Sequence, residues 1–329
     1  MIKPFPKPNS DCPHINLERL PRREAVTVIA GLKNWRGVVL LADTQETVAH
    51  SKRHAAKLRF EPTTQFGGAI RAMGGRESSV QDLAVAFCGA GEGPFIDKLV
   101  DLSWKAARDS QSIQEACDEI ERTIKNAYRE FGNIYQAGRC PEVELIYGVK
   151  MGGTSRLFSA FGPVINEKDN YCSSGVGSYM ADFLLERMYA DHLTVQQCVI
   201  LAAYILFQAK EHVDGCGGDS HIAVLRNDGA SGLIETQLAD AITKNLDFSD
   251  HEAGRLLLAV ADPSLNDEKF NEEVKSVIDA LHLWRSVQQK DFKERQELRD
   301  HLRSMFQLEP EATDEFGLLK PSDDLTSED

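Results

Sequence analysis

The order of the predicted elements constrains the fold more than any other feature of this sequence. Two pairs of helical segments are separated by a strand hairpin, with buried strand-like runs before the first pair and after the second. A parallel sheet built from βαβ units alternates strands with single helices and does not give this order. The order instead predicts two mostly antiparallel sheets stacked face to face, with a pair of helices on each outer face.

The strands that precede the first helix pair are predicted from apolar, β-branched runs. AVTVIAGL (25–32) and GVVLLAD (37–43) are separated by four residues, which predicts a strand, a tight connection and a second strand. Near-continuous apolarity in the second run favours burial on both of its faces. Residues 61–80 are rich in glycine, threonine and serine and predict a loop, and LAVAFCG (83–89) predicts a third buried strand.

The helices and the later strands have recognisable start signals. Pro94 begins the first helix, where a missing N–H costs nothing. Ser112 and Glu115 predict a capping box for the second helix, and Thr194 with Gln197 caps the last of the four. The remaining predicted elements are strands 143–151 and 156–161, joined by Gly152-Gly153, a helix within 175–189, and a final strand over 220–226.

Four segments are expected along the chain. Residues 1–24 read as an irregular leader, 25–232 as the core domain, 233–308 as a helical C-terminal extension and 309–329 as an acidic, disordered tail. Apolar residues at helical spacing between Asn266 and Met305 predict one or two long amphipathic helices in the extension. The tail from Glu309 holds eight acidic residues and one lysine, and such a composition favours a solvated chain.

Composition excludes several classes of function. The net charge of −14 argues against general nucleic-acid binding, which depends on neutralising phosphates. No apolar run is long enough for a membrane helix, and the proline-containing N-terminus lacks the apolar core of a secretory signal. We therefore expect a cytoplasmic protein with neither a membrane nor a nucleic acid as partner.

The seven cysteines predict reduced thiols rather than a disulfide framework. They are scattered, odd in number and form no C-x-x-C pair. Zinc binding by Cys12 and His14, or by His212, Cys216 and His221, is an alternative, but these spacings fit no usual zinc site. We predict no metal and no organic cofactor.

A series of motifs resembles one known family across about 200 residues. The segment from Thr27 to Asp43, with Gly31 and Gly37, resembles the opening of a mature proteasome β-subunit or its HslV-type relative. The further matches, in family order, are Lys57-Leu58, Phe87-Cys88-Gly89-Ala90-Gly91, Ser174-Gly175-Val176-Gly177-Ser178 and Cys216-Gly217-Gly218-Asp219. The resemblance implies an α+β fold, the four-layer αββα sandwich of N-terminal-nucleophile (Ntn) hydrolases, with a helical C-terminal extension.

The resemblance also implies a catalytic site. Thr27 would be the nucleophile once the leader is removed, and its free α-amine, with a pKa of roughly 8, would be the base. Lys57 would lower the pKa of that amine, and Asp43 would hold Lys57 in place. The Gly89 N–H would stabilise the tetrahedral oxyanion. Supporting roles would fall to Ser178 and Asp214, which lie near the positions of the family's supporting serine and aspartate.

Three functions remain open at the level of the sequence. The first is a threonine-type peptidase matured at Thr27, assembled as a homo-oligomeric ring, with any ATPase partner unknown. The second is a non-catalytic structural or assembly subunit that keeps its leader, because β-branched Val26 would crowd self-cleavage and Val176 replaces the family's serine. The third is an amidase acting on a small molecule.

Overall fold

A computed structural model describes residues 27–48, 51–61, 83–134, 140–228, 231–234 and 236–305. The predicted leader 1–24, the predicted tail 309–329, nearly all of the predicted loop 61–80, and Cys12 with His14 lie outside the described residues. The described chain is an α+β protein with two five-stranded antiparallel sheets and a separate two-stranded ribbon.

The first sheet contains β1 and β2, which form the first hairpin of the described chain. Its strand order is β10-β1-β2-β11-β12, and every pairing is antiparallel. The strands are β1 Ile29–Asn34, β2 Gly37–Asp43, β10 Tyr171–Ser174, β11 Ser220–Arg226 and β12 Gly232–Leu233. All seven residues of β2 are buried, as its uninterrupted apolar run predicted. The bounds of β2 and β11 match the prediction from sequence.

The second sheet has the order β5-β6-β7-β8-β9 and is also antiparallel throughout. Its strands are β5 Leu58–Glu61, β6 Ala84–Gly91, β7 Val143–Met151, β8 Thr154–Phe161 and β9 Val164–Lys168. Gly152 and Gly153 join β7 to β8 with φ angles of 57° and 76°. Both angles are positive, as the tightest hairpin turns require, so the predicted hairpin is confirmed.

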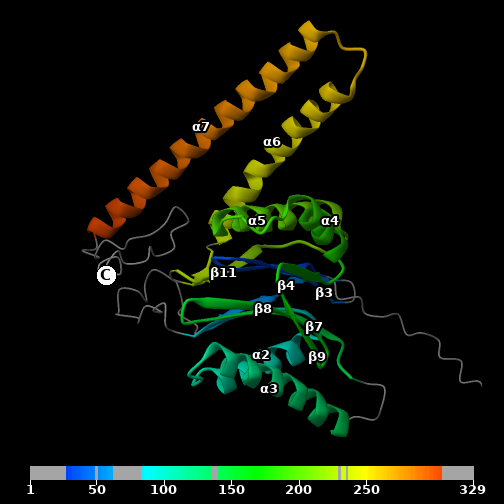
Figure 1. Ribbon diagram of the computed structural model, residues 1–329, viewed down its shortest axis with the longest axis vertical. Coiled ribbons are helices and arrows are strands. Elements are labelled where there is room, and N and C mark those ends of the chain that lie inside the picture. The colour runs from blue at the N-terminus through cyan, green and yellow to red at the C-terminus, as the bar shows by residue number, and fades with distance from the viewer. Residues whose placement is uncertain are drawn as a thin grey trace, which may run out of the picture.

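The two sheets pack face to face, and helices cover their outer faces (Figure 1). One core cluster lies between the sheets, and in it Ile29 and Leu40 of the first sheet share an apolar layer with Ile146 of the second. Gly31 brings the sheets close, because a Cβ there would lie 2.7 Å from Leu157. The short ribbon of β3 Gln45–Val48 and β4 Ser51–His54 continues from the end of β2.

Each outer face has its own helix pair and its own core. Helices α2 Gly93–Ala107 and α3 Ile113–Ile134 pack on β6 and β7, with Phe95, Leu99 and Ile120 buried there. Helices α4 Ser178–Met188 and α5 Val195–His212 pack on β1 and β2 through Leu184 and Leu201. The predicted capping box of Thr194 and Gln197 is present at the start of α5.

Two long helices follow the sandwich and form a hairpin that projects from the α5 side (Figure 1). They are α6 Thr236–Ala261 and α7 Asp267–Met305. Phe248 and Trp284 stack between them, and Arg255 joins α6 to α7 by an ion pair with Glu273. The sequence predicted α7 and left α6 unassigned. Among the helices of the described chain, none is long and apolar enough to cross a membrane.

Candidate functional site

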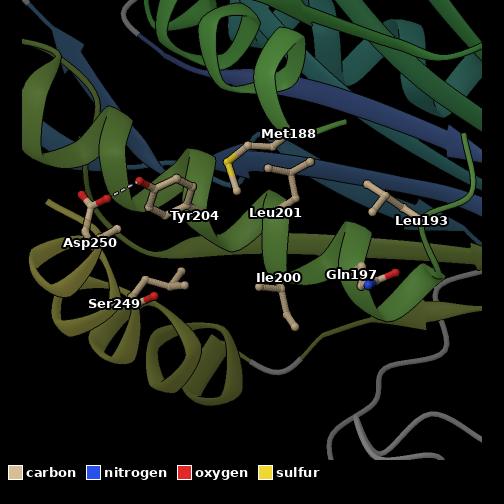
Figure 2. Close-up of a pocket in the computed structure, with 10 residues that line it drawn as sticks. Met188, Leu193, Gln197, Ile200, Leu201, Tyr204, Ser249 and Asp250 are labelled. Atoms are coloured by element: carbon tan, nitrogen blue, oxygen red, sulfur yellow. Dashed lines mark hydrogen bonds between the residues drawn. The ribbon is translucent and has the colours of Figure 1, made fainter. Parts of the chain in front are cut away.

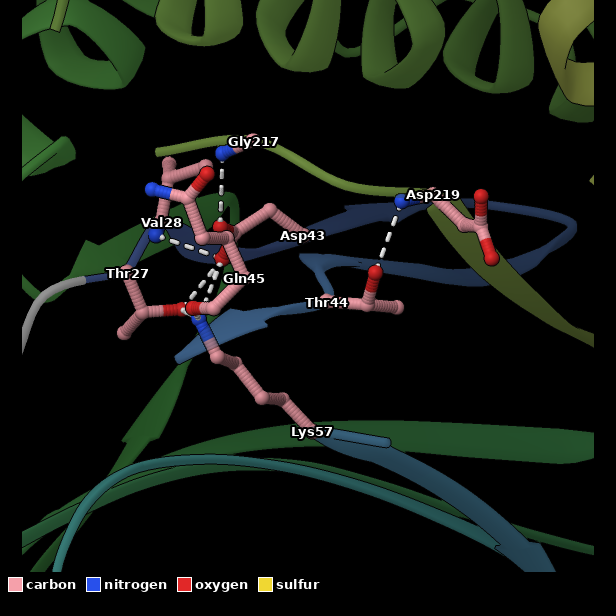
Figure 3. Close-up of polar contacts among 8 residues, drawn as sticks. All are labelled: Thr27, Val28, Asp43, Thr44, Gln45, Lys57, Gly217 and Asp219. Atoms are coloured by element: carbon pink, nitrogen blue, oxygen red, sulfur yellow. Dashed lines mark hydrogen bonds and ion pairs between the residues drawn. The ribbon is translucent and has the colours of Figure 1, made fainter. Parts of the chain in front are cut away.

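A threonine, an aspartate and a lysine meet at one end of the first sheet (Figure 3). The Lys57 Nζ lies 2.6 Å from the Thr27 Oγ1 and 2.8 Å from the Asp43 Oδ1. The Thr27 hydroxyl donates a hydrogen bond to the same Asp43 oxygen. Three groups that are up to 30 residues apart in the chain thus share one contact point.

The backbone places these groups before any side-chain contact forms. Asp43 is the last residue of β2, whose antiparallel pairing with β1 sets Ala42 opposite Ile29. Thr27 lies two residues before β1 and therefore reaches the same sheet edge. Lys57 immediately precedes β5 of the other sheet, and the length of its side chain spans the gap between the sheets.

The Asp43 carboxylate is buried and fully engaged. Besides Thr27 and Lys57, its Oδ1 accepts from the Val28 N–H at 3.1 Å, and its Oδ2 accepts from the Gly217 N–H at 3.0 Å. The residue has no exposed surface, and the Lys57 side chain is 10% exposed. Burying a charge is costly unless it is paired and hydrogen-bonded, and both conditions hold here.

The Lys57 ammonium has a third acceptor, the backbone carbonyl of Gln45. An ammonium carries three N–H donors, and Thr27, Asp43 and Gln45 receive one each. The arrangement fixes the charge beside the Thr27 oxygen. A positive charge at that distance favours the alkoxide form of the hydroxyl and so prepares the oxygen for nucleophilic attack.

The backbone of residues 217–219, which leads into β11, holds the Asp43–Gln45 segment by hydrogen bonds. The Gly217 carbonyl accepts from the N–H groups of Thr44 and Gln45, and the Asp219 N–H donates to the Thr44 Oγ1 at 2.7 Å (Figure 3). A side chain at Gly217 would collide with the Gln45 side chain, with a Cβ only 2.5 Å from its Oε1. A side chain at position 217 would therefore require the Gln45 side chain to move.

The main chain of Thr27 is held by the turn between β10 and α4. The Gly177 N–H donates to the Thr27 carbonyl at 3.0 Å. Gly175 lies so close that a Cβ added to it would be 2.4 Å from the Thr27 carbonyl oxygen. Its φ of 85° also favours glycine. Thr27 is 2% exposed, so contacts surround its backbone as well as its hydroxyl.

The N–H of Gly89, which was predicted to be the oxyanion donor, already donates a hydrogen bond within the protein. Its N–H donates to the Lys57 carbonyl at 3.0 Å as β6 pairs with the start of β5. The bond ties the backbone of Lys57 to the second sheet. The structure therefore gives the Gly89 N–H a scaffold contact in place of an open position toward an oxyanion.

The two supporting residues predicted from sequence do not join the cluster. Asp214 is exposed in the turn after α5, and Ser178 begins α4 with its N–H donating to the Gly175 carbonyl. Within the described residues, no hydrogen bond or ion pair links either side chain to Thr27 or Lys57. Val176, at the position of the family's serine, packs against the core under α4 and α5.

Sequence reasoning missed Glu144 and Gln45, and it named Gly217 only as part of a motif, without a contact. Gln45 and Gly217 act through their backbones, and the sequence gives no signal for that role. Glu144 did carry a signal, because it interrupts the inward-facing positions of a strand that is otherwise almost entirely apolar. Its carboxylate accepts from the Ser174 hydroxyl and from the Gly175 N–H.

The electrostatics around the cluster disfavour a second nucleophile. Burial, reinforced by the Asp43 charge and opposed by Lys57, raises the pKa of the Cys216 thiol to about 12. The thiol is therefore neutral at physiological pH. Burial lowers the pKa of His221, partly offset by nearby Asp219. Across the part of the chain that the structure describes, no group of three His, Cys, Asp or Glu side chains could hold a metal ion.

A separate cavity of about 330 Å³ lies between α5 and α6 and contains none of these groups (Figure 2). Met188, Ile200 and Leu246 give it an apolar lining. At one side Asp250 accepts hydrogen bonds from Tyr204 at 2.6 Å and from Gln208 at 2.7 Å. These bonds attach the base of the helical hairpin to the sandwich.

Taken together, the two antiparallel sheets and the helices that cover them give an α+β sandwich that is shared with solved structures. No model of a protein family matches the chain, and no curated protein matches it. The likeness is found among solved structures.

Solved structures that this chain resembles include those of Anbu, described as an ancestral beta-subunit. Anbu from Yersinia bercovieri has a TM-score of 0.55 and 14% identity, covering 73% of this chain and 100% of that one. Anbu from Hyphomicrobium sp. strain MC1 has a TM-score of 0.52 and 14% identity, covering 69% and 96%. The helical assembly of the Anbu complex from Pseudomonas aeruginosa gives 0.53 and 14%, covering 74% and 99%.

These matches correct the family drawn from the sequence. The motifs were attributed to the proteasome β-subunit and HslV-type family, and that attribution was wrong, because the structural neighbours are Anbu proteins. In this chain the motifs are glycines at close contacts and polar residues at strand ends. At 14% identity the likeness establishes the fold alone.

Proposed function

We propose that this protein is a threonine-type amide-bond hydrolase in which Thr27 becomes the nucleophile after the preceding residues are removed. The observation that carries the proposal is the contact of the Lys57 ammonium, 2.6 Å from the Thr27 Oγ1, within a cluster anchored by buried Asp43. Isolated polar residues at strand ends serve structural roles, but a buried ammonium aimed at a hydroxyl stabilises the developing alkoxide.

The first reaction is cleavage of the Val26–Thr27 peptide bond. The Thr27 Oγ1 attacks the Val26 carbonyl carbon, and the C–N bond breaks, so that the acyl group moves from the threonine nitrogen to its oxygen. The hydroxyl proton already points to Asp43, and the departing nitrogen takes up a proton to become an amine. Water then hydrolyses the ester, which releases the leader and restores the hydroxyl.

Turnover of a substrate repeats the same bond changes in trans. The new α-amine of Thr27 accepts the hydroxyl proton, and the hydroxyl oxygen attacks the substrate carbonyl. The leaving amine departs with that proton, and water hydrolyses the acyl ester. Lys57 stabilises negative charge on Oγ1 in both halves, and Asp43 keeps the ammonium in place. The chemistry of these groups requires no metal or organic cofactor.

Intact mass and N-terminal sequencing of the purified chain test the proposal. We expect a species that begins at Thr27, and we expect Thr27→Ala to remain uncleaved and inactive. Thr154→Ala is the matched control, because Thr154 is an exposed threonine at the start of β8, far from the cluster. A wild-type chain that keeps its full mass and hydrolyses no amide would refute the proposal.

Two substrate classes fit the same chemistry, polypeptides and small amides. A panel of fluorogenic peptides and simple aryl amides, with Thr27→Ala as the blank, distinguishes them. Hydrolysis of peptides above three residues at higher kcat/KM than aryl amides would identify a peptidase. The opposite ranking would identify an amidase.

A non-catalytic assembly subunit is the second candidate. It is favoured by the engagement of the Gly89 N–H with the Lys57 carbonyl and by the exposed position of Asp214. Only full-length chain, with a leader that resists removal, would be found in that case. The same intact-mass measurement therefore decides between the two functions.

The proposal includes the architecture and assembly in which the site would work. We take the fold to be the four-layer αββα sandwich of Ntn hydrolases over residues 25–232, with the helical extension over 233–308. The helical assembly of the Anbu complex from Pseudomonas aeruginosa supports a homo-oligomer. Light scattering of the purified chain tests that state. A ring, a cytoplasmic location and any ATPase partner stay predictions.

A further inference from the structure

Glu144 connects the second sheet to the turn that holds Thr27. Along β7, Leu145 and Tyr147 face α2 and α3, whereas Ile146 faces the first sheet. Because strand residues alternate between faces, Glu144 lies on the same face as Ile146 and points toward the first sheet. It stands one residue inside the N-terminal end of β7, opposite Ala90 of β6, at the rim of the core between the sheets.

The contacts of Glu144 are specific to that turn. One carboxylate oxygen, Oε2, accepts from the Ser174 hydroxyl and from the Gly175 N–H at 3.1 Å. Hydrogen bonds to an ionised carboxylate are about twice as strong as neutral ones. A single anionic group therefore holds the end of β10 and the start of the turn at the same point.

The turn passes this restraint to Thr27. Gly175 approaches the Thr27 carbonyl so closely that it has no room for a side chain. Two residues later, the Gly177 N–H donates to the same carbonyl oxygen at 3.0 Å. The Thr27 carbonyl therefore rests on a turn whose position Glu144 sets. Lys57 contacts the Thr27 hydroxyl, and Asp43 contacts both that hydroxyl and the Val28 N–H on the other side of the same peptide unit.

We infer that Glu144 is a positioning residue, which aligns the Thr27 oxygen with the Lys57 ammonium by fixing the 174–177 turn under the Thr27 carbonyl. The reactive role of the threonine rests on the proposed function, but the restraint itself does not. A misplacement of about 1 Å can lower the rate of a reaction by about 100-fold. Loss of Glu144 is therefore expected to lower kcat by about 10- to 100-fold.

Hydrogen exchange of the Gly175 and Gly177 amides, followed by NMR in the full chain, measures the restraint directly. We expect Glu144→Ala to accelerate exchange at both amides by at least about 10-fold. Glu144→Gln keeps an acceptor oxygen of the same shape and should largely restore protection. Glu142→Ala is the matched control, because Glu142 is an exposed glutamate two residues earlier on the same segment.

Kinetics of the same variants separate positioning from a general loss of structure. We expect Glu144→Ala to lower kcat with KM and thermal midpoint nearly unchanged, and Glu144→Gln to recover most of kcat. Unchanged exchange at Gly175 and Gly177 would overturn the inference, and so would faster exchange with an unaltered kcat in a wild type that turns over. If the wild type is neither cleaved nor active, the proposed function fails, and the exchange result alone upholds or overturns the restraint.

Discussion

The Thr27 end of the sandwich and the α6–α7 hairpin show two opposite uses of polar and apolar residues. At the Thr27 end, Asp43 has no exposed surface, and each of its oxygens accepts hydrogen bonds. On the hairpin, Leu257 and Leu258 are 68% and 71% exposed although they are apolar. The first region buries polar groups that are paired with one another, and the second leaves apolar side chains exposed.

The two regions also differ in the interactions that hold them in place. A buried cluster of charges adds little net stability, because desolvation offsets the attraction between them. The hairpin is held to the sandwich by apolar packing of Ala239 and Leu246 of α6 on the core beneath α5, and by polar contacts such as that of Tyr204 with Asp250.

The largest expected effect comes from removing the ammonium. Lys57→Met should lower both leader cleavage and amide hydrolysis by about 1000-fold, because the Thr27 oxygen loses the charge that stabilises its alkoxide. Time-resolved intact mass and initial rates measure it. Lys98→Met, at an exposed lysine on α2, is the control and should leave both rates unaltered. Similar losses of rate in Lys57→Met and Lys98→Met would show that the effect does not depend on the contact between Lys57 and Thr27.

Glycine substitutions should differ in sign between the two regions. Gly177→Ala should destabilise the fold by about 1–3 kcal/mol, because its Cβ would lie 2.7 Å from Val28 and 2.9 Å from Cys216. Gly254→Ala on α6 should stabilise it by up to about 1 kcal/mol, because nothing lies within 4 Å and alanine favours a helix. Urea unfolding at one pH measures both. Equal changes in the free energy of unfolding for Gly177→Ala and Gly254→Ala would contradict this difference between the two regions.

The attachment of the hairpin should depend on one phenol. Tyr204→Phe removes the donor to Asp250 and should weaken the contact of α6 with α5 by about 1 kcal/mol. Faster amide exchange in the turns of α6 around Asp250, with protection in β2 unchanged, is the expected observation. Phe183→Leu, at an exposed position on α4, serves as a control. Loss of protection in β2 would mean that the hairpin and sandwich unfold as one unit.

The smallest effect on stability is expected at the exposed leucines. Leu257→Gln should change the free energy of unfolding by less than about 0.5 kcal/mol, because the side chain contributes little to the folded core of one chain. Light scattering over a concentration series shows whether the same change lowers self-association. A loss of more than about 2 kcal/mol would place Leu257 in a buried contact.

Local pattern was sufficient to predict much of the sandwich. The bounds of β2, β7 and β11 followed from apolar runs between turn residues, and the starts of α2 and α5 from Pro94 and Thr194. Short strands were missed for a physical reason. β9 has no buried residue and β10 only one, so neither shows the alternation that marks a half-buried strand.

The candidate site was predictable only where side chains carry the contact. Thr27, Asp43 and Lys57 lie at strand ends that the pairing brings together, and the sequence identified them. The oxyanion role of Gly89 could not be judged from the sequence, because the sequence does not reveal which acceptor a backbone N–H will meet. In the structure that acceptor is the Lys57 carbonyl. Asp214 was chosen by its position in the chain, but the turn after α5 leaves its side chain in solvent.

Gly89 lies between helix α2 and Lys57 and contacts both. Ile96 in the first turn of α2 lies against Gly89, where even a methyl group would be 2.5 Å from it. The Gly89 N–H donates a hydrogen bond to the Lys57 carbonyl, and the Lys57 ammonium donates one to the Thr27 hydroxyl oxygen. Ile96, Gly89 and Lys57 thus form a continuous series of contacts from α2 to the Thr27 oxygen, so the packing of α2 bears directly on the segment that carries the ammonium.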